Sequence, residues 1–388
     1  MNNKMIAGMP EVLRLTQAGQ LQEATFAIQR MLGGLSGTPA ASEPATYTEK
    51  APIESVFRVI DEEPLRAARA AEAPQPQPIP GRMPDGIPEG KFITGSYTNQ
   101  AGTRAYKLYI PGGYRGQSLP LVVMLHGCTQ NPDDFAAGTR MNQIAEEQQC
   151  FVLYPAQAES ANASKCWNWF KQSDQRRDRG EPSIIAGTTR QIMSSYSVDP
   201  QRVYVAGLSA GGAMAVTMGM TYPEVYAAIG VHSGLAYAVA HDVPSAFAAM
   251  RQSSSANGRM EIGAASTMCD VPTIVFHGDR DTTVHPGNGD QVIAQSRAVG
   301  ANGDSDTQDG ASNRATVQRG QVAQGHAYTR TIYHDAGGQA IVEHWLVHGA
   351  GHAWSGGSVS GSFTDPKGPD ATQEMIRFFR EHPQLTRH

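Results

Sequence analysis

The chain has 388 residues, of which 40% are hydrophobic and 17% are charged, and its formal net charge at pH 7 is -5. This composition is typical of a globular protein, and the negative charge gives no long-range attraction to nucleic acid or to an anionic membrane. Because no run approaches the roughly 18 apolar residues that cross a bilayer, we expect no membrane span and no nucleic-acid partner.

The first 90 residues differ in amino-acid composition from the rest of the chain. Apolar residues at helical spacing predict a small helical hairpin over residues 1–35, and the Pro- and Ala-rich residues 36–90 predict a flexible linker. The N-terminus shows no apolar stretch of the kind that signal peptides carry, so we expect a cytoplasmic protein. Residues 91–388 are interpreted as one catalytic domain.

Short apolar runs separated by helical patterns fill this domain. The turn sequence NQAGT before residues 104–111 predicts an antiparallel hairpin. Six later runs are apolar almost throughout, which indicates strands buried on both faces, and so an α/β fold with a mostly parallel sheet and helices on both faces. These runs are residues 119–127, 150–155, 202–209, 226–234, 272–279 and 343–349.

Residues 301–325 are polar and glycine-rich, and they predict an exposed loop between the last two core strands. Their aspartates lack the spacing and the terminal glutamate of a calcium-binding EF-hand loop. The pattern therefore indicates a solvated loop and no metal site.

The sequence Gly-Leu-Ser-Ala-Gly around Ser209 follows an apolar strand and precedes a run of small helix-forming residues. A sharp strand-to-helix turn of this kind presents a serine oxygen clear of the backbone and leaves the next amide, that of Ala210, to stabilise an oxyanion. We therefore predict that Ser209 is a nucleophile. The alternative is a small residue in a glycine-rich turn.

Such an elbow predicts an acid and a histidine later in the chain. Asp281 lies just beyond a strand end, where its carboxylate can reach an imidazole, whereas Asp279 lies closer to the strand and is interpreted as a turn residue. His352 lies in a glycine-rich loop, whereas His344 and His348 lie on the preceding strand and are interpreted as packed or solvent-facing. We predict the triad Ser209, Asp281 and His352.

The loop after the strand at 119–127 is the expected source of a second oxyanion donor, which we assign to the amide of Cys128 beside Ala210. His126 precedes it, and the sequence leaves open whether it stabilises the loop or contacts substrate. The four cysteines lack the CxxC spacing of a zinc site, so one disulfide or free thiols remain as alternatives.

Six motifs occur together and in order, and they resemble the polyhydroxybutyrate (PHB) depolymerase family of esterases, which has feruloyl and acetyl xylan esterase relatives. The resemblance covers roughly residues 92–380. The motifs are LHGCTQNPDDFAAGTRMNQIAEEQQCFVLYPAQ, CWNWF, VYVAGLSAGGAMA, VHSGLAY, PTIVFHGDRDTTVHPGNGDQV and GAGHAWSGG.

The resemblance implies an α/β-hydrolase fold and ester cleavage through an acyl-enzyme, with no cofactor or metal. It matches the family nucleophile, acid and histidine to Ser209, Asp281 and His352, and it pairs Cys128 with Cys166 in a disulfide. It also implies that aromatic side chains near the site bind substrate. These candidates are Trp167, Trp169 and Trp354, with His126 beside them, and core packing is the alternative for the tryptophans.

Family members that act on solid polymer usually carry a signal peptide and a polymer-binding domain, whereas this chain ends 36 residues after His352. We therefore expect short polyhydroxyalkanoate oligomers, amorphous polymer or related polyesters as substrate. Feruloyl or acetyl xylan-type esters, a peptidase activity on the same fold, and a granule- or partner-binding protein docking through residues 1–35 are the alternatives. An extracellular location, as for secreted members, is the alternative compartment, and the oligomeric state is left open.

Overall fold

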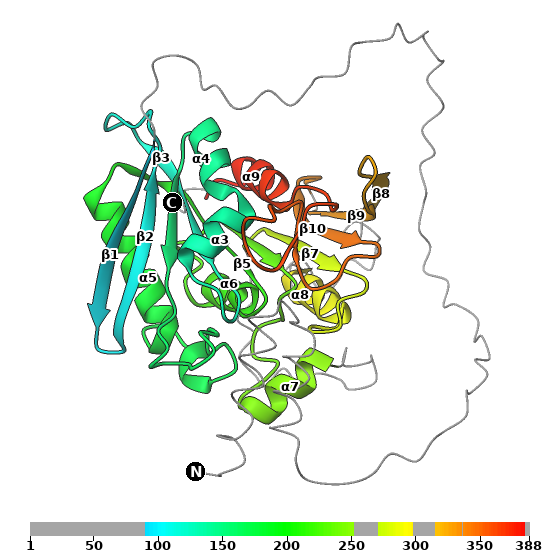
Figure 1. Cartoon of the computed structure of the whole chain (residues 1–388), viewed down its shortest axis with the longest axis horizontal. Helices are drawn as coiled ribbons and strands as arrows, with labels where there is room; N and C mark the ends of the chain where they lie inside the picture. The colour runs from blue at the N-terminus through cyan, green and yellow to red at the C-terminus, as the bar shows by residue number, and fades with distance from the viewer. Residues whose placement is uncertain (1–89, 252–270, 298–314, 336, 385–388) are drawn as a thin grey trace, which may run out of the picture. The chain divides into compact units, whose positions relative to one another are not determined.

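The computed structural model describes residues 90–251, 271–297, 315–335 and 337–384 (Figure 1). The chain divides into a unit of residues 1–77 and a unit of residues 78–388, and every described residue belongs to the second. The hairpin predicted for residues 1–35 lies outside the described residues, and so does the linker predicted for residues 36–90 except for Gly90.

Ten strands of the described residues form one sheet, in the order β1-β2-β4-β3-β5-β6-β7-β10-β9-β8. Strands β4, β3, β5, β6, β7 and β10 run parallel, and antiparallel strands extend the sheet at both ends. The bounds are β1 Lys91–Asn99, β2 Gly102–Ile110, β3 Leu119–Leu125, β4 Phe151–Pro155, β5 Val198–Leu208, β6 Ala228–His232, β7 Thr273–Gly278, β8 Ala315–Gln321, β9 Ala327–His334 and β10 Ala340–Val347. The prediction of a mostly parallel sheet is confirmed, and so is the β1-β2 hairpin.

Helices cover both faces of this sheet (Figure 1). The side chains of the central parallel strands alternate between two apolar cores. On β3, Leu121 and Val123 enter the core formed with α5, α6 and α8, whereas Val122 and Met124 enter the core formed with α3, α4 and α9. Both sets are buried, which explains the continuous apolar runs. The bounds are α3 Pro132–Thr139, α4 Met141–Gln148, α5 Gly180–Ser195, α6 Ala210–Thr221, α7 Val243–Arg251, α8 Gly287–Arg297 and α9 Ala371–Glu381, with a 3-10 turn at Gln172–Gln175 and the short parallel pair β11 Trp354–Ser355 and β12 Thr364–Asp365.

The prediction of an exposed loop over residues 301–325 is wrong in conformation for residues 315–321, which form strand β8, although most of these residues are exposed as predicted. This strand is mostly exposed and has no apolar alternation, so its hydrogen bonds with β9, and not burial, hold it extended. Residues 301–314, which include the three aspartates considered for calcium, lie outside the described residues. Among the residues that are described, no helix is long and apolar enough to span a membrane.

Candidate active site

Ser209 occupies the turn between β5 and α6, with φ 57° and ψ -119°. A serine with positive φ is in a sparsely populated backbone conformation, which persists only where the surrounding structure enforces it. The residue is partly exposed, while α6 behind it is buried along its whole length. This geometry matches the predicted elbow.

The glycines on either side of Ser209 are required by the close approach of the backbone. A methyl group on Gly211 would lie 2.0 Å from the carbonyl oxygen of Leu125 and 2.6 Å from that of His126. A methyl group on Gly207 would lie 2.4 Å from the carbonyl carbon of Gly211. Contacts this short cannot form, so the Gly-x-Ser-x-Gly spacing follows directly from the packing of the turn against β3.

Asp281 and His352 are joined by a hydrogen bond of 2.6 Å between the carboxylate Oδ2 and the imidazole Nδ1. The other carboxylate oxygen accepts the backbone N–H groups of Thr283 and Val284 at 2.9 and 2.8 Å. Counted with its backbone, the residue Asp281 is only 5% exposed. With Nδ1–H directed to the carboxylate, Nε2 of His352 is the nitrogen left to act as a base.

The carboxyl group of Asp281 is held in its charged form. Burial alone would raise its pKa, but hydrogen bonds from His277 and His352 outweigh that effect and hold the pKa well below its usual range. The His277 Nε2 atom lies 3.4 Å from Oδ2 of Asp281 and 2.9 Å from the carbonyl oxygen of Val284. Asp281 is therefore a buried anion able to orient an imidazole and to stabilise its positive charge.

Ser209, Asp281 and His352 follow β5, β7 and β10, which are parallel strands of one sheet. Their carboxyl ends lie at the same edge of the sheet, so the structure brings the three predicted triad residues to that edge. Strand β6 lies between β5 and β7, and its last residue, His232, accepts the backbone N–H of Ser209 at 2.9 Å through its carbonyl oxygen.

The sequence interpretation gave His232 no role. Its Nε2 accepts the backbone N–H of Ser355 at 2.9 Å, so the buried ring ties β6 to the segment that follows His352. Burial, together with the nearby His277 and His352, lowers its pKa to about 3. The neutral ring thus serves as a fixed hydrogen-bond acceptor.

A second aspartate–histidine pair lies next to the first. Asp279 Oδ2 is 3.0 Å from Nδ1 of His348, and Oδ1 accepts the backbone N–H of Gly349 at 2.7 Å. The His348 Nε2 atom accepts the hydroxyl of Thr329 at 2.8 Å. Asp279 is therefore more than a turn residue, because it anchors the start of the loop that carries His352. The side chain of His348 is 39% exposed.

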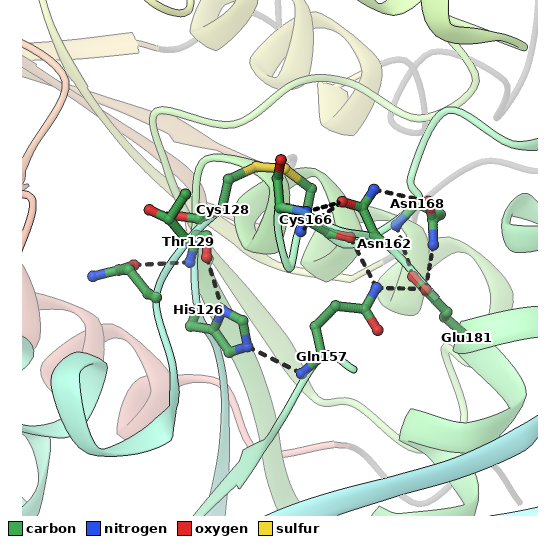
Figure 2. Close-up of a disulfide and its surroundings, with 11 residues drawn as sticks. His126, Cys128, Thr129, Gln157, Asn162, Cys166, Asn168 and Glu181 are labelled. Atoms are coloured by element: carbon green, nitrogen blue, oxygen red, sulfur yellow. Dashed lines mark hydrogen bonds between the residues drawn. A yellow bond between two sulfur atoms is a disulfide. The ribbon is translucent and has the colours of Figure 1, made fainter. Parts of the chain in front are cut away.

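The loop that contains Cys128 is fastened to the segment before Trp167 by a disulfide between Cys128 and Cys166 (Figure 2). A backbone hydrogen bond of 2.7 Å from Thr129 to the carbonyl of Ser164 runs beside it. The structure thus contains the cysteine pair that the family resemblance implied.

His126, which follows β3, and Glu181, on α5, both bond to Gln157, the second residue after β4. His126 donates from Nδ1 to the carbonyl of Gly127 at 2.7 Å and accepts the backbone N–H of Gln157 at Nε2 (Figure 2). Burial lowers the pKa of His126 to about 4, so the ring is neutral. Glu181 accepts from the side-chain amides of Gln157 and Asn168, and burial, with Asp174 nearby, raises its pKa.

The substrate-binding assignments need correction. His126, Trp167, Trp169 and Trp354 are all 6% exposed or less. The indole N–H of Trp354 donates to Thr372 inside the core. The three tryptophans belong to the apolar cores, and the hydrogen bonds of His126 stabilise its loop, so this degree of burial supports packing and not substrate contact. The sequence could not separate these alternatives, because the local pattern around a tryptophan does not specify whether its side chain is buried.

Within the described ranges, no group of three or more His, Cys, Asp or Glu side chains is arranged to hold a metal ion.

The sheet order, the strained serine turn and the aspartate–histidine pair define an α/β hydrolase. An acetyl xylan esterase from Aspergillus awamori has this fold, and it superimposes with a TM-score of 0.55 at 19% identity over 74% of this chain and 99% of its own. Residues 104–323 match the family described as Esterase PHB depolymerase, and the chain belongs to this family. The resemblance found in the sequence is confirmed.

Curated relatives agree with this family. Poly(3-hydroxyalkanoate) depolymerase C of Paucimonas lemoignei is 32% identical over 262 residues, which are 66% of this chain and 59% of that protein. Poly(3-hydroxybutyrate) depolymerase of Ralstonia pickettii is 29% identical over 64% of this chain and 50% of its own length. Acetylxylan esterase A of Talaromyces purpureogenus is 29% identical over 70% of this chain and 72% of its own. The chain thus spans only about half the length of the two depolymerases.

Proposed function

We propose that this protein is a serine esterase that hydrolyses carboxylic esters through an acyl-enzyme. The observation that carries the proposal is the buried Asp281–His352 pair at the sheet edge where Ser209 occupies a strained elbow. An activated serine needs a base for its proton and a charge partner for that base, and these residues supply both.

In the proposed mechanism, His352 takes the proton of Ser209 while the serine oxygen attacks the ester carbonyl. Asp281 holds the imidazole in the required tautomer and stabilises the imidazolium. The backbone amides of Cys128 and Ala210 donate to the oxyanion, for which one such donor contributes about 3 kcal/mol. The protonated His352 then gives its proton to the leaving alcohol, and water repeats these steps on the acyl-enzyme.

The substrate class we propose is short polyhydroxyalkanoate esters, as oligomers or accessible polymer. Two relatives named as depolymerases of poly(3-hydroxyalkanoate) or poly(3-hydroxybutyrate) support this choice. Acetyl xylan is the second candidate, because the acetylxylan esterase of Talaromyces purpureogenus matches a larger share of both chains. Initial rates on a hydroxybutyrate trimer and on acetylated xylan, measured at equal ester concentration, separate the two.

The disulfide between Cys128 and Cys166 is relevant to the cellular compartment of the protein. Disulfides persist in oxidising compartments and are rare in the reducing cytoplasm. The bond between Cys128 and Cys166 therefore supports the extracellular alternative over the cytoplasmic expectation.

The reaction is tested with Ser209→Ala and His352→Ala, assayed on p-nitrophenyl butyrate. We expect kcat/KM to fall at least about a thousandfold in each, because triad members act as a unit. Ser194→Ala, which changes an exposed serine at the end of α5, is the matched control and should keep the parent rate. Residual activity above about a hundredth of the parent in Ser209→Ala would reject the assignment of the nucleophile.

A further inference from the structure

Gln130 lies in the loop after β3 that carries Cys128, and its side chain is buried at 2% exposure. Its Oε1 atom accepts the backbone N–H of Gly127 at 2.9 Å. The carboxamide thus closes a ring within the loop and fixes the peptide unit between His126 and Gly127, one unit before the one that carries the N–H of Cys128. No role for Gln130 follows from the triad itself.

The amide nitrogen of the same side chain bonds to residues outside the loop. Nε2 donates to Oδ2 of Asp134 at 2.9 Å and to the carbonyl oxygen of Ser362 at 3.1 Å. Asp134 in turn accepts the backbone N–H of Ser362 at 2.8 Å and its hydroxyl at 2.6 Å. Three polar residues therefore form a closed network between the Cys128 loop and the segment that follows His352.

The network acts close to the nucleophile. A methyl group built on Gly127 would lie 3.7 Å from Cβ of Ser209 and 3.5 Å from the carbonyl oxygen of Leu208. A shift of Gly127 by a few tenths of an ångström would therefore alter the space in front of Ser209. It would also turn the N–H of Cys128, which is the next residue.

We propose that Gln130 is a positioning residue for the oxyanion hole. Its Oε1 atom accepts from Gly127, and its Nε2 atom donates to Asp134 and Ser362. These bonds fix the loop, so that the Cys128 amide is oriented toward the oxyanion position before substrate binds. The carboxamide supplies both an acceptor for Gly127 and a donor for Asp134. This inference rests on the proposed function, because it concerns the donor assigned there to Cys128.

An oxyanion donor is effective only while it is held in place, and losing one completely costs about 10²–10³ in kcat. In Gln130→Met, which keeps length but has no polar atoms to bond Gly127 and Asp134, we expect kcat to fall about 10- to 100-fold with KM within about threefold. Gln130→Glu keeps an acceptor for Gly127 but places a carboxylate beside that of Asp134, and its kcat should fall by a similar factor.

The decisive variant is the combination Gln130→Glu with Asp134→Asn, which exchanges the amide and the carboxylate within the pair. Asn can donate to Glu, so the contact within the pair is restored, whereas the contact from position 130 to the carbonyl oxygen of Ser362 is not. We therefore expect kcat to recover in part, to at least about threefold above that of Gln130→Glu. Inhibition by phenylboronic acid, which forms a tetrahedral adduct with an active serine, should weaken in Gln130→Met by the same factor as kcat. Gln148→Met, on the exposed face of α4, is the matched control.

The proposal is overturned if Gln130→Met keeps kcat within threefold of the parent, if the loss appears in KM instead, or if the exchanged pair stays as slow as Gln130→Glu. Should Gln130→Met fail to fold, the comparison between Gln130→Glu and the exchanged pair still decides. If the parent protein has no esterase activity, or if the Ser209→Ala variant is active, the proposed function is rejected. The inference on Gln130 is then rejected as well.

Discussion

At the scale of single residues, two aspartates after β7 each hold a histidine after β10, and they differ in burial. Asp281 has no exposed side-chain surface, whereas the side chain of Asp279 is 34% exposed. A buried carboxylate acts on its imidazole in a low dielectric, while an exposed pair is weakened by water. From this difference in burial we propose that Asp281, and not Asp279, has the orienting role.

This assignment predicts different effects for two matched variants. Asp281→Asn should lower kcat by about 10³- to 10⁴-fold, because an amide neither stabilises the imidazolium nor fixes the tautomer. Asp279→Asn should lower kcat less than about tenfold, since the amide oxygen still accepts from Gly349. Steady-state kinetics on a p-nitrophenyl ester measure both. Equal losses would show that the two pairs share the role.

Individual residues differ in how well the sequence predicted them. The positions of Ser209 and Asp281 after strand ends were predictable because each follows an apolar strand at a recognisable turn, and their catalytic roles stay a prediction. The burial of Trp167 was not predictable, because a tryptophan has the same local pattern in a core as in a binding site. In the structure it lies in the apolar core, and the centroid of the His126 ring is 5.7 Å from that of Trp167.

At the scale of elements, the β5-turn-α6 unit is specified by its small residues. The backbone of Gly211 packs directly on the carbonyl groups at the end of β3, so no side chain fits there. This local requirement is the reason that a short glycine pattern predicts both a turn and the helix after it.

Gly211→Ala is therefore expected to lower the free energy of unfolding by about 1–3 kcal/mol or more, through forced displacement of β3. Gly351→Ala is the control, because a methyl group on Gly351 would meet nothing within 4 Å. Its unfolding free energy should stay within about 0.5 kcal/mol of the parent. Urea unfolding followed by tryptophan fluorescence measures both, and equal stability of the two variants would contradict the close packing at the elbow.

The antiparallel strands β8 and β9 were the elements that the sequence interpretation missed. Buried parallel strands are recognisable because both of their faces are apolar, whereas β8 exposes most of its residues. Its conformation comes from pairing with β9, and pairing between two polar segments leaves little trace in the sequence.

At the scale of the whole molecule, three buried histidines are neutral when folded. Burial lowers the pKa of His126 and His344 to about 4 and that of His232 to about 3, from an ordinary value of 6.5. Below pH 6.5 the unfolded chain binds protons that the folded protein does not. Stability from these groups is therefore full above pH 6.5 and is lost as the pH falls toward 4.

We expect the free energy of unfolding to decrease over this interval, with each histidine contributing at most about 1.4 kcal/mol per pH unit. His126→Gln, whose amide oxygen can still accept from Gln157, should make the decrease shallower by up to that amount. His241→Gln, at an exposed position, should leave the slope unchanged. Urea titrations from pH 7 to pH 4.5 measure the slopes, and identical slopes for the parent and His126→Gln would contradict a neutral buried His126.

The sequence by itself determined the central parallel strands, the serine elbow and the placement of Ser209 and Asp281 directly after strands, because these depend on local backbone conformation and on burial along single strands. Only the tertiary structure decided which aspartate is buried against His352, that the tryptophans lie in the core, and that Gln130 reaches Ser362 across 232 positions of the chain. Contacts between residues so far apart arise when the sheet brings the loops at its carboxyl edge together, and no local pattern specifies them.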